Sequence, residues 1–108
     1  TKMAKRTNPE ITQIISEYLI ALRKHRVKFN SVYLFGSFVK NTHHRDSDID
    51  LAIVLSKKNI DPVDDTVALM KLRRNIDLRI EPHPFSVTEF DKTDPFIREI
   101  ITTGIRLA

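Results

Sequence analysis

The amino-acid sequence predicts an α/β layer fold in one small domain. Segments with helical periodicity alternate along the chain with short apolar segments that are typical of strands. A length of 108 residues is enough for one hydrophobic core and too short for two. No sequence repeat or low-complexity stretch interrupts this alternation. We therefore expect residues 1–108 to form a single domain, with residues 1–7 as a flexible basic tail.

The first expected element is a helix that begins near Pro9. Asn8 is an N-cap candidate, Pro9 suits the first helical position, and Glu10 places an acid in the first turn. Basic residues at 23–26 follow where positive charge suits the negative end of the helix dipole. Between these ends, apolar side chains recur at the spacing of one helical face: Ile11, Ile14, Ile15, Tyr18, Leu19 and Leu22.

Two strands are expected next. Residues 32–35 form a short apolar run, rich in β-branched and aromatic side chains, that ends at Gly36-Ser37. A polar stretch follows, and residues 48–54 then alternate in polarity. This alternation places Asp48 and Asp50 on one face of the second strand and apolar side chains on the other.

The second half of the sequence predicts a helix from about residue 62 to residue 74 and a third strand over residues 76–81. Apolar side chains follow Pro62 at helical spacing. Residues 76–81 then alternate strictly, with Asp77 on the polar face, and the prolines that follow are expected to end the strand.

Three local signals mark the C-terminal part of the chain. The pattern at residues 86–89 matches a capping box and predicts a short helix. Asp94-Pro95 opens a last helix, and Gly104 is well placed as the residue that follows it. Residues 105–107 could add a short final strand.

Composition excludes several classes of site. The chain has no cysteine, which excludes a disulfide scaffold, a thiolate zinc site and a cysteine nucleophile. It shows neither an apolar run long enough to cross a bilayer nor a secretory leader, so we expect a cytoplasmic protein. A formal net charge of +4 weakly favours an anionic partner, although the basic residues 23–28 are interpreted as a solvated helix end. The two histidines within residues 43–46 are interpreted as exposed loop residues rather than zinc ligands.

The candidate functional residues are Gly36-Ser37 and the aspartates that follow ten residues later. Glycine at a strand end lets the backbone turn tightly and approach a ligand, and the Ser37 hydroxyl can donate to a phosphate oxygen. The carboxylates of Asp48 and Asp50 repel each other unless a cation lies between them, and Mg²⁺ prefers carboxylate, water and phosphate oxygens. If the second and third strands are neighbours, Asp77 can face this pair. Three convergent carboxylates suit a two-metal phosphoryl-transfer centre.

The segments 33–38 and 47–51 resemble the signature of the nucleotidyltransferase fold in the DNA polymerase β superfamily. They look most like the minimal nucleotidyltransferases of bacteria and archaea. The resemblance spans about residues 10–105 in length and element order, and its specific residues lie in 33–51 together with Asp77. It implies a nucleotidyltransferase fold, in which helices pack against a small mixed central sheet.

The resemblance also implies a role for each candidate residue. Gly36 and Ser37 would hold the triphosphate of ATP, and Asp48 and Asp50 would bind one or two Mg²⁺ ions. Asp77 would complete the second metal site and help to deprotonate the acceptor hydroxyl. The expected reaction is transfer of AMP to that hydroxyl with release of pyrophosphate.

The partner is implied by the same family. Its stand-alone members are commonly encoded beside a helical HEPN-type ribonuclease toxin and act as its antitoxin. The expected acceptor is therefore a tyrosine of such a toxin, where AMPylation adds a bulky anionic group. Two alternatives stay open: an antitoxin that acts by occlusion without catalysis, and nucleotidyl transfer to a small molecule or to RNA.

Each acidic candidate also has a structural interpretation. Asp48 and Asp50 could form only a solvated strand face, and Asp77 could be an exposed strand acid paired with Arg79. Glu81 shares the face of Asp77 but lies further along, and it is interpreted as a surface residue.

Overall fold

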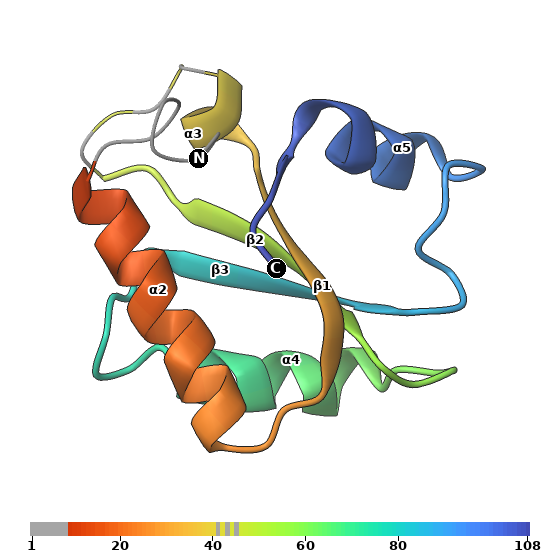
Figure 1. Cartoon of the computed structure of the whole chain (residues 1–108), viewed down its shortest axis with the longest axis horizontal. Coiled ribbons are helices and arrows are strands. Elements are labelled where there is room, and N and C mark those ends of the chain that lie inside the picture. The colour runs from red at the N-terminus through yellow and green to blue at the C-terminus, as the bar shows by residue number, and fades with distance from the viewer. Residues whose placement is uncertain (1–8, 41, 43, 45) are drawn as a thin grey trace.

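The structure is a computed structural model that describes residues 9–40, 42, 44 and 46–108 of the chain. The tail predicted over residues 1–7 and the N-cap predicted at Asn8 lie outside the described residues, as do Asn41, His43 and Arg45. The fold is the α/β class that the sequence predicts (Figure 1). Its elements are α2 (Pro9–Lys24), β1 (Phe29–Phe35), α3 (Ser37–Lys40), β2 (Ile49–Leu55), α4 (Pro62–Lys71), β3 (Ile80–Ser86), α5 (Pro95–Thr103) and β4 (Ile105–Arg106).

The four strands form one mixed sheet in the order β3-β2-β1-β4. β1 runs antiparallel to both β2 and β4, whereas β2 and β3 are parallel. A parallel pair needs a crossover, and α4 supplies it between β2 and β3. The small mixed sheet expected from the nucleotidyltransferase resemblance is therefore confirmed.

The hydrophobic core lies between one face of the sheet and the helices α2 and α4. The apolar stripe predicted for the first helix is buried over its full length, and Leu69 is the buried residue of α4. These side chains meet the inward-facing residues of β1, β2 and β3 in one cluster, while α5 lies elsewhere in the fold (Figure 1). Among the described residues, no helix is long and apolar enough to cross a membrane.

Aspartate caps begin two of the helices at the predicted positions. The side chain of Asp61 accepts backbone N–H bonds from Val63 and Asp64, and α4 then runs to Lys71, three residues short of the expected end. The Asp94 carboxylate likewise accepts from Phe96 and Ile97, with proline in the first turn.

The third strand differs from the prediction. Residues 72–79 form consecutive turns instead of a strand, and β3 begins at Ile80. The Arg73 guanidinium holds these turns by donating to the carbonyl oxygens of Leu78 (3.1 Å) and Ile80 (2.7 Å). Leu78, assigned to the apolar side of the alternating pattern, is 68% exposed, whereas Ile80 on the same side is buried.

Pro82 and Pro84 lie inside β3, whereas the sequence pattern predicted that they would end the third strand. Within the described residues β3 is an edge strand that pairs with β2 alone, where Pro82 is opposite Leu51 and Pro84 is opposite Ile53. Residues two apart in an edge strand direct their backbone nitrogen atoms to the same side. Both prolines can therefore face the free edge, where no N–H donor is needed and where proline blocks pairing with another chain.

Two C-terminal details also differ from expectation. The capping box forms, since Ser86 and Glu89 exchange backbone-to-side-chain bonds of 2.9 and 3.2 Å, but it stabilises a turn and no helix follows. Gly104 ends α5 in an extended conformation rather than a left-handed one. Glycine is needed there because an added Cβ would overlap the carbonyl oxygens of Ile100 and Leu34. β4 is present as predicted.

We expect Tyr18→Phe to lower the free energy of unfolding by about 1–2 kcal/mol, because a buried acceptor loses its partner. The buried Tyr18 hydroxyl donates to the Leu69 carbonyl oxygen of α4 at 2.8 Å, and burial raises the pKa of this hydroxyl. Urea unfolding followed by circular dichroism measures the change. Tyr33→Phe is the matched control, since that half-buried tyrosine packs on Phe90 by its ring. Equal losses of unfolding free energy in both variants would contradict a stabilising hydrogen bond from Tyr18 to Leu69.

Candidate active site

Gly36 and Asp50 are in direct contact at the end of β1. Gly36 has a φ of 81°, a backbone conformation that glycine adopts without strain. A Cβ at this position would overlap the Oδ2 atom of Asp50 and lie 3.2 Å from its Cγ. The β1–β2 register explains the contact, because Phe35 is paired with Asp50. The structure thus brings together two residues that the sequence predicts to share a site.

Ser37 follows the glycine as the first residue of the one-turn helix α3. The turn is closed by the Gly36 carbonyl oxygen, which accepts from the backbone N–H groups of Val39 and Lys40 at 3.1 Å each. Phe38 is buried and anchors the turn to the core. Ser37 is half-buried and directly follows the Gly36–Asp50 contact in the chain.

Asp48 and Asp50 lie at the start of β2. Asp48 is exposed and directly precedes the strand, whereas Asp50 is its second residue. Every other side chain of β2 is buried, so Asp50 is the only residue of this strand that is partly open to solvent. A carboxylate in an otherwise apolar strand is costly without a partner.

His83 is the partner that the structure gives to Asp50. Its Nε2 atom lies 3.1 Å from the Oδ1 atom of Asp50, and its ring packs on Phe35 with ring centres 5.1 Å apart. The parallel register places His83 opposite Ala52, on the same face as Asp50. The same register places Glu81 directly opposite Asp50.

Sequence reasoning missed His83 and treated Glu81 as surface. His83 was hidden by the assumption that Pro82 ends the strand, whereas Glu81 was placed on the polar face of the expected strand and set aside because it lies further along than Asp77. A signal was nonetheless present: Glu81 and His83 are two residues apart, flanked by prolines, at the spacing of one strand face. Glu81 is held in place by Arg73, whose Nη1 atom lies 3.5 Å from the Glu81 Oε2 atom.

Asp77 lies outside the strand on which it was expected. It belongs to the turns before β3, and its carboxylate binds Arg79 through Nε at 3.1 Å and Nη2 at 2.9 Å. These side-chain bonds from Arg79 hold the pKa of Asp77 below its ordinary value. Arg79 also reaches Glu10 of α2 at 3.3 Å. The predicted placement of Asp77 on a strand facing Asp48 and Asp50 is therefore wrong, and its role as a metal ligand stays a prediction.

The donor set at the start of β2 fits a magnesium ion. Within the described part of the chain, no group of three or more His, Cys, Asp or Glu side chains is already gathered in the arrangement of a metal site. Mg²⁺ does not need such a cage, because one or two carboxylates suffice when water and substrate phosphates supply the remaining oxygens. Asp48 and Asp50 offer two carboxylates at the start of β2, and that of Asp50 lies against Gly36.

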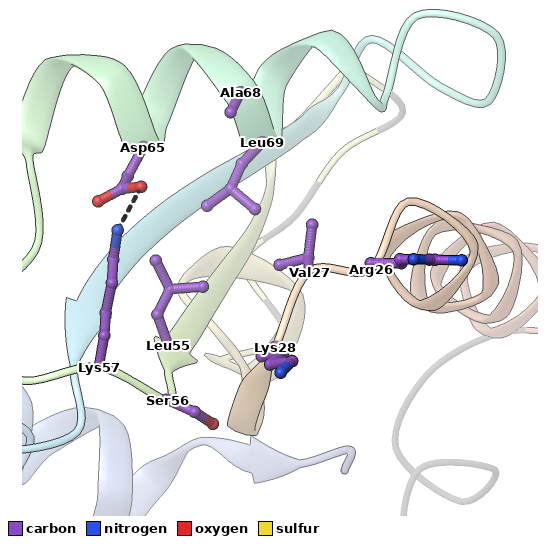
Figure 2. A pocket seen from close by; sticks show the side chains of 9 residues that line it. All are labelled: Arg26, Val27, Lys28, Leu55, Ser56, Lys57, Asp65, Ala68 and Leu69. Atoms are coloured by element: carbon purple, nitrogen blue, oxygen red, sulfur yellow. Dashed lines mark hydrogen bonds and ion pairs between the residues drawn. The ribbon is translucent and has the colours of Figure 1, made fainter.

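A pocket lies at the end of the β1–β2 pair opposite to Gly36 and Asp50. It has a volume of about 340 Å³ and is bounded by the start of β1, the end of β2 and α4. Figure 2 shows the apolar side chains of Val27, Leu55 and Leu69 directed toward one another, with the 2.8 Å Lys57–Asp65 ion pair along one side. None of the predicted site residues lines it.

The fold and the site together define a nucleotidyltransferase domain: a mixed sheet with a Gly-Ser turn after one strand and two carboxylates at the start of the next. The family model "Polymerase beta, Nucleotidyltransferase" matches residues 17–108. The chain therefore belongs to the polymerase β nucleotidyltransferase family. No protein among the curated sequences matches the chain.

Solved structures share this fold. A candidate nucleotidyltransferase from Sulfolobus solfataricus superposes with a TM-score of 0.65 at 16% identity, covering 90% of this chain and 80% of that one. A variant of the toxin–antitoxin pair MntA-HpeT gives 0.60 at 23% identity, covering 86% and 71%. A toxin–antitoxin structure with AMP-PNP gives 0.56 at 24% identity, with the same coverage.

We expect Gly36→Ala to lower the free energy of unfolding by about 2–4 kcal/mol, the sum of left-handed backbone strain and overlap with Asp50. In an Asp50→Ala background the overlap is removed, and the same substitution should cost only about 1–2 kcal/mol. A double-mutant cycle of urea unfolding measures this coupling. Additive effects of the two substitutions would show that the glycine and the carboxylate are not in contact.

We expect Asp77→Asn to destabilise the protein at pH 7 and to have a progressively smaller effect as the pH falls below about 3.9. A carboxylate whose folded-state pKa is depressed contributes stability above its unfolded pKa of about 3.9, and this contribution is lost as pH falls through the folded value. Urea midpoints across this pH range measure the difference. Glu17→Gln, on the exposed side of α2, is the control. An effect of Asp77→Asn that is independent of pH would contradict the ion pair.

Proposed function

We propose that this domain transfers a nucleoside monophosphate, AMP from ATP, to the hydroxyl of an acceptor in a metal-dependent reaction. The contact between Gly36 and Asp50 carries the proposal, because it places the backbone turn at Gly36 beside a carboxylate that suits a metal. Membership of the nucleotidyltransferase family supports the reaction class. The AMP-PNP in one structural neighbour supports an adenine nucleotide as donor.

Each residue of the site has a distinct task in this proposal. Gly36 gives the triphosphate close access to the backbone, and the Ser37 hydroxyl donates to a phosphate oxygen. Asp48 and Asp50 would hold one or two Mg²⁺ ions, which supply charge neutralisation at the reacting phosphate when bound. The acceptor oxygen forms a bond to the α-phosphorus, the bond to the β-phosphate oxygen breaks, and pyrophosphate leaves.

Glu81 is the better placed third carboxylate. It lies in register with Asp50 on the neighbouring strand, whereas Asp77 is engaged by Arg79 in the preceding turns. Arg73 keeps the Glu81 side chain beside the start of the sheet. We therefore assign to Glu81 the role predicted for Asp77, the completion of a second metal site and assistance in removing the acceptor proton.

The acceptor we favour is a tyrosine of a HEPN-type toxin, with the domain acting as antitoxin in the cytoplasm. The toxin–antitoxin structures among the neighbours support this choice. Transfer of AMP would add a bulky anionic group to the toxin and inactivate it. Occlusion without catalysis is the second candidate, favoured by the same complexes because they show toxin and antitoxin bound together.

Incubation with α-labelled ATP, Mg²⁺ and a toxin encoded beside this domain tests the reaction. We expect label on the toxin with the wild-type protein, and a loss of about 100-fold or more with Asp48→Asn/Asp50→Asn, because metal and transition-state charge are no longer held. EDTA should have the same effect. Equal labelling by the double variant would overturn the catalytic proposal.

Neutralisation of the toxin separates catalysis from occlusion. The double variant is compared with the wild type at matched complex formation, measured by size-exclusion chromatography. If the variant forms the complex but fails to protect, catalysis is required. Full protection by the variant would establish occlusion, and labelling of RNA or of a small molecule in place of the toxin would change the acceptor.

A further inference from the structure

A small pocket opens beside Gly36, on the side of α5. It has a volume of about 170 Å³, and its walls come from the end of β1, the turn of α3 and one face of α5. Gly36 itself is part of the wall, so the pocket is continuous with the turn proposed to hold the triphosphate. A drug-sized ligand requires about 300–1,000 Å³, so this pocket accommodates one part of a ligand, such as a single ring system.

Aromatic rings link the pocket to the candidate catalytic carboxylate. The ring of Phe35 packs on His83, which contacts Asp50, and on its other side meets Phe96 edge-on with ring centres 5.8 Å apart. Phe96 lies in the first turn of α5 and is 50% exposed, although it packs on Phe35 and Phe85. A flat ligand that entered the pocket would find the surface of Phe96 available for stacking.

The two charged side chains in the pocket wall have opposite charges and form an ion pair. Lys40 of α3 and Glu99 of α5 form an ion pair of 3.1 Å, and both side chains are about half exposed, at 54% and 53%. A phosphate would gain from Lys40 but be repelled by Glu99, so the wall does not favour a second anion. It does offer both donors and acceptors, which suit the edge of a neutral heterocycle.

We infer that this pocket, with Phe96 as its stacking surface, receives the nucleobase of the nucleoside triphosphate. The inference rests on the proposed function, because it takes the phosphates to lie at Gly36 and the carboxylates. If the phosphates bind at the Gly36 turn, the base can enter the pocket, because Gly36 also forms part of the pocket wall. Lys40 and Glu99 then read its polar edge, so the same pair determines which bases are preferred.

The decisive comparison is between ATP and inorganic tripolyphosphate, which has the phosphates but no base. Binding of each is measured by isothermal titration calorimetry in the presence of Mg²⁺. Phe96→Ala should weaken ATP binding at least about fivefold, since stacking of a base on an aromatic ring is worth about 1–3 kcal/mol. Binding of tripolyphosphate should be unchanged.

Two further variants make the comparison specific. Phe90→Ala is the matched control, because Phe90 packs on Tyr33 and Phe85 in the same aromatic group but does not line the pocket. It should leave both affinities at the wild-type value. Phe96→Leu retains apolar bulk but lacks the aromatic surface, so it tests stacking if Phe96→Ala is poorly folded by circular dichroism.

The outcomes separate this inference from the proposed function. If the wild type binds ATP and the Phe96 variants bind it equally well, the pocket does not hold the base and the inference fails alone. If those variants bind ATP normally but transfer AMP more slowly, the pocket serves the acceptor instead, which also overturns it. If the wild type binds neither ATP nor tripolyphosphate, the proposed function fails and the inference fails with it.

Discussion

The contact between the Cα atom of Gly36 and the carboxylate of Asp50 sets the geometry of the whole site. It arises from the antiparallel pairing of β1 and β2, whose register ends with Phe35 opposite Asp50. The next residue must turn away from the sheet without a side chain, and a φ of 81° with no Cβ satisfies both requirements. The turn of α3, the position of Ser37 and the pocket that borders Gly36 all follow from that one register.

The edge strand β3 completes the same face from the other side. Its prolines suit the free edge, while the alternate residues Glu81 and His83 come to lie near Asp50. Arg73 connects this arrangement to the crossover, because it binds both the carbonyl oxygen of Ile80 and the side chain of Glu81. The helices α2 and α4 pack on one face of the sheet (Figure 1), and the opposite face carries Asp50, His83 and aromatic rings that pack on one another.

Local patterns predicted most of this fold from the sequence. The first helix, the first two strands and the last helix have strong local signals, and Gly36 and Asp50 were expected in one site from a glycine at a strand end and an alternating aspartate pair. The third strand could not be predicted from alternation, because the free edge of the sheet, which exists only in the folded chain, is what tolerates Pro82 and Pro84. Because of this error, Asp77 was expected to be the third acidic residue of the site, whereas the register places Glu81 opposite Asp50.

The central claim is that the start of β2, against Gly36, is a metal and triphosphate site. A crystal structure with Mn²⁺ and a non-hydrolysable ATP analogue tests it most directly, since anomalous scattering locates the metal independently of activity. We predict a Mn²⁺ peak within coordination distance of the carboxylates of Asp48 and Asp50, with the phosphates along Gly36 and Ser37. A metal and nucleotide bound elsewhere, for example in the pocket between α4 and the end of β2, would contradict it.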